Sequence, residues 1–165
     1  MQGKLLATAA IAALFAVPAF AQTWKDSVDV ETDLAAIQSP EAAQRYANLD
    51  DDLTTAIVAL LEQRAEMGDG GNANIKVDVD EVSLAAPFMG NGGVSSSALS
   101  GKVIVDVRGG TQLSPDNYTL TVSMDQAMPY IPANMDVTVM EPSSDEIYNA
   151  LIQAFAANVV SKLYD

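Results

Sequence analysis

Apolar and polar residues alternate along three stretches in the middle of the chain. The pattern runs through residues 75–79, 99–107 and 118–124, and it is most regular in the last of them. Alternation with a period of two is typical of a β-strand that buries one face and leaves the other in water. The sequence therefore predicts three strands, and Val137 and Val139 indicate a short fourth strand at an edge of the sheet.

A helical period precedes these strands. Ser39–Glu41 suits a helix start, with serine at the N-cap, proline at the first position and glutamate near the positive end of the dipole. Apolar residues then recur every three or four positions over residues 46–61. Asp50–Asp52 interrupts that stripe, either on the solvent side of one long helix or as the cap of a second helix that begins near Leu53. We favour a second helix, because aspartate is a poor interior residue and a good cap.

The last segment has the strongest helical pattern. Ser143 and Glu146 fit a capping box, and apolar residues follow at helical spacing from Ile147 to Leu163. The order of elements is thus helix, three or four strands, helix. Because consecutive strands with short connections pair as an antiparallel meander, we predict an α+β fold. Its antiparallel sheet of three or four strands would be covered on one face by the N-terminal and C-terminal helices.

The first 21 residues predict export. Lys4 gives a positive start, the run from Leu5 to Val17 is almost entirely apolar, and Ala19–Ala21 ends in a small-residue cleavage pattern. This order is typical of a secretory signal peptide, and the run is short for a bilayer span of about 20 residues. We therefore expect a signal peptide over 1–21 and a periplasmic protein, with secretion beyond the periplasm as an alternative.

The remaining chain has the length of one domain. We assign residues 22–38 to a mature N-terminal segment, which is either loose or a short first helix, and residues 39–165 to a single α+β domain. Removal of Lys4 with the signal would leave seven basic and 22 acidic residues, a net charge of −15. Because nucleic-acid binding depends on basic side chains, we expect no nucleic-acid partner.

The chain contains neither cysteine nor histidine. Without cysteine there is no disulfide, no thiol chemistry and no lipidation site, so we expect no membrane anchor after signal cleavage. Histidine is the usual general base near neutral pH and the commonest transition-metal ligand. We therefore expect a protein that is not an enzyme and that carries no cofactor.

Three acidic residues form a candidate cation site. Asp78 and Asp80 are two apart on a predicted strand, so their carboxylates would share one face, and Glu81 follows directly. Calcium prefers such oxygen ligands, although the spacing does not match an EF-hand loop. The alternative is the solvated face of an amphipathic strand.

Several apolar residues lie in predicted loops, where contacts with a ligand or a partner are common. They are Phe88 and Met89 in a long glycine-rich loop, and Met128 and Tyr130 on the two sides of Pro129. Trp24 near the expected mature N-terminus is a further candidate, since tryptophan is enriched in interface hot spots. The alternative is that these residues fold back onto the core.

The layout of Asp50 to Leu163, with its amphipathic last helix, resembles small exported bacterial proteins. It also resembles the periplasmic α+β domains of curli-assembly-type lipoproteins, although the chain lacks their lipidation cysteine. The resemblance implies a periplasmic α+β domain and assigns no functional residue.

The leading functional hypothesis is a non-enzymatic periplasmic protein that binds or supports another envelope protein, because exported sheets with free edges can pair with a partner. The alternative is a module that binds a small ligand or calcium. A more remote alternative is a carboxylate-dependent hydrolase, whose chemistry needs only two suitably spaced acids.

Overall fold

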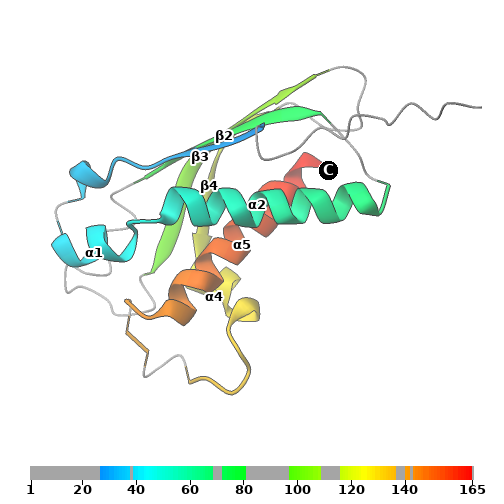
Figure 1. The fold of residues 1–165 in the computed structure, drawn as a ribbon. Helices are drawn as coiled ribbons and strands as arrows, with labels where there is room; N and C mark the ends of the chain where they lie inside the picture. Colours follow the sequence, from blue (N-terminus) through cyan, green and yellow to red (C-terminus); the bar gives the residue numbers. More distant parts are fainter. Residues whose placement is uncertain are drawn as a thin grey trace, which may run out of the picture.

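The computed structural model describes residues 27–37, 39–68, 72–80, 97–108, 116–136, 140–141 and 143–164. These residues form an α+β fold in which two long helices lie on one side of a four-stranded sheet (Figure 1). The predicted fold class is therefore confirmed. The predicted signal peptide and the predicted strand at Val137 and Val139 lie outside the described residues.

The strands follow one another across the sheet in chain order. They are β1 (Val28–Glu31), β2 (Ala73–Val79), β3 (Ala98–Val107) and β4 (Asp116–Ser123). β2, β3 and β4 pair antiparallel, as the alternating pattern predicts, whereas β1 runs parallel to β2. The sheet is thus mixed, with two antiparallel pairings and one parallel pairing.

β1 was not expected from the sequence. The segment 22–38 was predicted to be loose or a short first helix, but Val28 and Val30 are buried while Asp29 and Glu31 are exposed, which is the pattern of a strand. The chain then makes a 3₁₀ turn, η2 (Leu34–Ala36), before the helices. Parallel strands need a long crossover connection, and the helices between β1 and β2 supply it.

The first helical region is split in two, as predicted, but not where it was predicted. α1 (Pro40–Arg45) begins with Ser39 as its N-cap, whose hydroxyl oxygen accepts the Ala42 N–H at 3.3 Å. α2 (Leu49–Glu66) has Asn48 as its N-cap, so Asp50–Asp52 lies in its first turn instead of capping a helix near Leu53. Carboxylates are favourable there because they face the positive end of the helix dipole.

Two other boundaries also differ from the sequence prediction. β4 ends at Ser123, and Met124, which continues the alternating pattern, instead begins the short helix α4 (Met124–Ala127). The 3₁₀ turn η5 (Met128–Tyr130) follows it. α5 (Asp145–Leu163) is capped by Ser144, one residue after the predicted cap, and its hydroxyl oxygen accepts the Ile147 N–H at 3.4 Å.

The core lies between the sheet and the two long helices. α2 packs against β1 and α5, while α5 also packs against β3 and β4. Gly101 on β3 allows this close approach, because a Cβ there would lie 3.1 Å from the Asp78 carbonyl oxygen and 3.4 Å from the Phe155 ring. The largest fully buried side chains are Phe155, Leu49, Leu53, Ile57, Leu61, Ile75, Leu99, Ile147, Leu163, Val77 and Val79. Within the described ranges, no helix is long and apolar enough to cross a membrane.

Candidate interaction edge of the sheet

β4 is the last strand of the sheet. In the part of the chain that the structure describes, it pairs with β3 and with no other strand. Along the side of β4 away from β3, one row of backbone N–H and C=O groups pairs with no other strand of the described residues. Such a row is a template for a further strand.

The hydrogen bonds of the neighbouring pair identify which residues form this row. The Asp80 N–H donates to the Ser100 carbonyl and the Arg108 N–H donates to the Asn72 carbonyl, each at 2.8 Å. Because bonded pairs alternate in an antiparallel ladder, even-numbered residues of β3 bond to β2 and odd-numbered residues bond to β4. The β3–β4 register pairs Gly101 with Leu120, so even-numbered residues of β4 face β3. The odd-numbered residues, 117 to 123, direct their backbone groups to the free edge.

Two of the four outward N–H groups have partners within the chain. The Asn117 N–H donates to the Asp116 carboxylate at 2.8 Å, and the Ser123 N–H donates to the side-chain oxygen of Gln126 at 3.0 Å. The N–H groups of Thr119 and Thr121 have no protein partner among the described residues, and both residues are exposed. The free part of the edge is therefore centred on Thr119 and Thr121. We name the strand segment Asn117–Ser123 the open edge.

The open edge lacks the features that prevent strands from pairing. Proteins usually protect an edge with proline, lysine or other charged side chains, a bulge, or a very short strand. The sequence NYTLTVS from Asn117 to Ser123 has no charge and no proline, and β4 pairs with β3 in a continuous register. Threonine, tyrosine and valine also favour the extended backbone.

Side-chain contacts hold β4 in place from both faces of the sheet. One face of the sheet is covered by the helices and is called the helix face; the other is called the open face. On the open face, the hydroxyl oxygens of Thr121 and Ser100 lie 2.9 Å apart, within hydrogen-bond distance. On the helix face, the Lys162 ammonium of α5 lies 4.5 Å from the Tyr118 ring centre and 3.9 Å from the Asp116 carboxylate. Burial, and secondarily the Asp116 charge, raises the pKa of Tyr118 to about 12. β4 is thus a fixed template that does not need to order itself before pairing.

The candidate residues Met128 and Tyr130 lie together just beyond this edge. Both belong to η5, five and seven residues after Ser123, and their side chains are 45% and 44% exposed. The structure therefore brings these two predicted contact residues to the end of β4. The other three, Trp24, Phe88 and Met89, lie outside the described residues.

The acidic candidates occupy the open face of the sheet. Asp78 is exposed and lies opposite Lys102 in the β2–β3 register, and Asp80 follows the end of β2. Both line a shallow depression of about 290 Å³ with Lys102 and Thr119. An ammonium group beside these carboxylates competes with a metal ion for them. Among the described residues no group of three or more potential ligands could hold a metal, and Glu81 lies outside them, so the calcium site stays a prediction.

A second polar cluster, which the sequence analysis missed, joins three helices. The Arg45 guanidinium of α1 lies 4.1 Å from the Tyr148 ring centre and 3.0 Å from the Asp145 carboxylate, both at the start of α5. The Tyr148 hydroxyl donates to the Asp52 carboxylate of α2 at 2.6 Å. Burial is the main cause that raises the pKa of Tyr148, and the bond to Asp52 adds to it. A neutral, donating Tyr148 thus ties the starts of α2 and α5 together.

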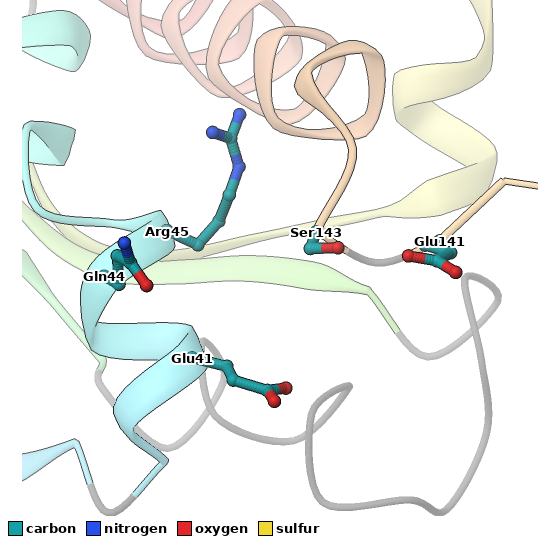
Figure 2. Close-up of a pocket in the computed structure, with 5 residues that line it drawn as sticks. All are labelled: Glu41, Gln44, Arg45, Glu141 and Ser143. Carbon is teal, nitrogen blue, oxygen red and sulfur yellow. The ribbon is translucent and has the colours of Figure 1, made fainter.

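An open polar pocket of about 550 Å³ lies beside this cluster (Figure 2). It is lined by Glu41, Gln44, Arg45, Glu141 and Ser143. Figure 2 shows the Arg45 side chain extending toward α5 and away from Glu41. Arg45 is therefore engaged with the helices, and the residues that line the pocket do not form an activated nucleophile with its base.

Comparison of the chain with protein-family models, with curated proteins and with solved structures found no match.

Proposed function

We propose that this protein is a non-enzymatic envelope protein that binds an extended segment of another envelope protein, which joins the sheet beside β4 as a fifth strand. One observation carries the proposal. Thr119 and Thr121 are exposed residues, and their outward N–H groups have no protein partner among the described residues. A strand laid along the edge would bond to every second residue of β4, and these two residues have that spacing.

The composition of the open edge supports the same proposal. An edge with no charge and no proline over seven residues carries a risk of unwanted pairing. An edge that binds a partner strand needs to be free of charge and proline in this way. Because main-chain bonds supply much of the affinity in this mode of recognition, the partner need only present an extended segment.

The expected location and the residue types add to this argument. The predicted signal peptide over residues 1–21 would deliver the chain to the periplasm, where the partner would be another envelope protein. The absence of histidine and cysteine from the sequence removes the side chains that most often act as general base and nucleophile. Binding is therefore a better use of this fold than catalysis.

Site-specific photocrosslinking in the native host tests the proposal. A benzophenone amino acid replaces Thr119 at the open edge or, as a control, Glu62, which is exposed on α2. We expect illumination to give one dominant heteromeric adduct from position 119 and none from position 62, with the adduct identified by mass spectrometry. The absence of an adduct at 119, or equal adducts from both positions, would contradict the proposal.

A proline variant makes the test specific to backbone pairing. The adduct is measured again with the crosslinker at Asn117, in chains that carry Thr119→Pro or the control Thr119→Val. Proline removes the outward N–H, whereas valine keeps it and favours the strand. We expect Thr119→Pro to reduce the yield at least fivefold and Thr119→Val to leave it unchanged. Equal yields would show that any contact at this edge does not depend on strand addition.

A further inference from the structure

The surroundings of the open edge differ on its two sides. Side chains of an added strand would alternate between the open face of the sheet and the helix face. On the open face their neighbours are Asn117, Thr119 and Thr121, which are polar and exposed. A partner residue on that side therefore meets water and hydroxyl groups and is best polar.

On the helix face the neighbours are apolar. Leu120 and Val122 turn inward there, and η5 packs against α5 on the same side. η5 follows α4 five residues after the end of β4 at Ser123. A partner segment that continues past the end of β4 would approach this part of the chain, which carries Met128 and Tyr130. Both side chains are close to half exposed, so apolar surface is available for a partner to cover.

The net charge of the chain favours a basic segment at the open edge. The chain carries a formal net charge of −14. Near the edge, the exposed acidic residues Asp116 and Asp125 are accompanied by two exposed lysines, Lys102 opposite Thr119 and Lys162 at 3.9 Å from the Asp116 carboxylate, so the acidic character comes from the chain as a whole. A second copy of the chain pairing here would bring two strongly acidic proteins together, and like charges oppose such an encounter. A basic segment would instead be attracted to the site.

We infer that the open edge receives an extended segment of a different protein that alternates apolar and polar residues and has basic residues at its ends. Its apolar side chains lie toward Met128 and Tyr130, and its polar side chains lie beside Thr119 and Thr121. This inference rests on the proposed function and adds the chemical class of the partner segment. It also gives the two exposed apolar residues of η5 a role in recognition.

Three synthetic peptides test the inference with the purified protein. The first has a Val-Thr-Val-Thr-Val centre and two lysines at each end. The second replaces the lysines by glutamates, and the third keeps the lysines and composition but reorders the centre to Val-Val-Val-Thr-Thr. Isothermal titration or fluorescence polarisation gives the affinities. We expect the first peptide to bind at least tenfold more tightly than either of the others and to weaken as salt increases.

Protein variants place the peptide on the open edge. Thr119→Pro should weaken binding of the first peptide at least fivefold, whereas Thr119→Val should not change it. Combined Met128→Ala and Tyr130→Ala should weaken it by a similar factor. The control Met67→Ala removes a side chain that is 63% exposed at the end of α2, and binding should stay the same. Circular dichroism checks that each variant is folded.

Equal affinities for the three peptides would overturn the inference, and so would an unchanged affinity after removal of Met128 and Tyr130. Failure of the inference is distinguishable from failure of the proposed function. If an adduct forms at position 119 in the host but the peptides are not discriminated, the edge binds a partner of another chemistry and only the inference fails. If no adduct forms at position 119, both fail.

Discussion

The two outer strands of this sheet differ in how well their free backbone groups are protected from pairing with another strand. β1 has four residues, and two of them, Asp29 and Glu31, place carboxylates on the open face. β4 has eight residues and carries no charge from Asn117 to Ser123. Short length and charge are two of the usual protections of an edge strand, so β1 is protected twice and β4 is not. A protein this acidic has charged residues to place along the open edge, and their absence from Asn117 to Ser123 points to use of that edge.

The largest test of this comparison uses one substitution at two neighbouring residues of β4. Leu120→Pro removes an N–H that bonds to β3 and a buried side chain, so we expect a loss of roughly 4 kcal/mol or more in the free energy of unfolding. Thr119→Pro removes an N–H that faces outward, where proline is tolerated, so we expect a loss of about 1 kcal/mol or less. Denaturation in urea measures both values. Similar losses would show that the assignment of inward and outward residues is wrong.

A second test asks whether the half-buried ring of Tyr118 holds the start of β4. The pKa of Tyr118 is raised to about 12, so the folded state holds this proton more tightly than the unfolded state, where the pKa is near 10. The resulting stabilisation is present below pH 10 and is lost as the pH rises from 10 to 12. Between pH 10 and 12, we expect the free energy of unfolding of Tyr118→Phe to fall by about 1 kcal/mol less than that of the unaltered protein. The difference is no larger because the partial exposure of Tyr118 reduces the effect of its shifted pKa.

Neutral pH gives this variant a second readout. The Tyr118 hydroxyl is buried and has no hydrogen-bond partner among the described residues, so its removal should cost nothing or stabilise the protein by about 1 kcal/mol. Tyr130→Phe alters an exposed tyrosine and serves as the control, with no change in stability expected at neutral pH. A clear loss of stability in Tyr118→Phe at neutral pH would indicate that the hydroxyl is bonded after all.

The elements with regular patterns were predictable from the sequence. Alternation identified β2, β3 and most of β4, and helical spacing identified α5. Ser39 was recognised as an N-cap because its signal is local. At Met124 two local signals competed. The alternation continued through it, but Ser123 and Gln126 have the spacing of a capping box, and the helix formed.

The features that define the site depend on distant contacts and were not predictable. β1 has only two alternations, too few to distinguish from a loop, and its partner Ile75 is far away in the sequence. Asp52 and Tyr148 are 96 residues apart, so no local sequence pattern predicts their hydrogen bond. That β4 lies at an edge follows from strand order, which a single sequence does not determine. The sequence therefore identified the strand but not its open side.

A third test gives β1 the composition of β4. The double change Asp29→Thr and Glu31→Thr leaves a short uncharged strand with threonines on the open face. If charge protects this edge, we expect the variant to self-associate about tenfold more tightly than the unaltered protein, as measured by sedimentation at increasing concentration. The matched control Thr119→Lys adds protection to β4 and should not increase self-association. No change in the double variant would show that its short length alone protects β1.

The smallest expected effect concerns the ion pair between Glu31 of β1 and Lys76 of β2. The Lys76 ammonium lies 2.8 Å from the Glu31 carboxylate, and its hydrogen bond to Glu31 is the main cause that raises the pKa of Lys76 above its ordinary value of 10.5. A raised pKa means that the folded state binds this proton more tightly, so the stabilisation is complete below the unfolded pKa and is lost only as the pH rises past that value.

Because both side chains of this ion pair are exposed, we expect Glu31→Gln to change stability only slightly near pH 7. The two proteins should converge further above pH 10.5, as measured by urea denaturation at each pH. A large destabilisation at neutral pH would mean that Glu31 holds β1 in the sheet. The difference between β1 and β4 would then be partly a difference in strand stability.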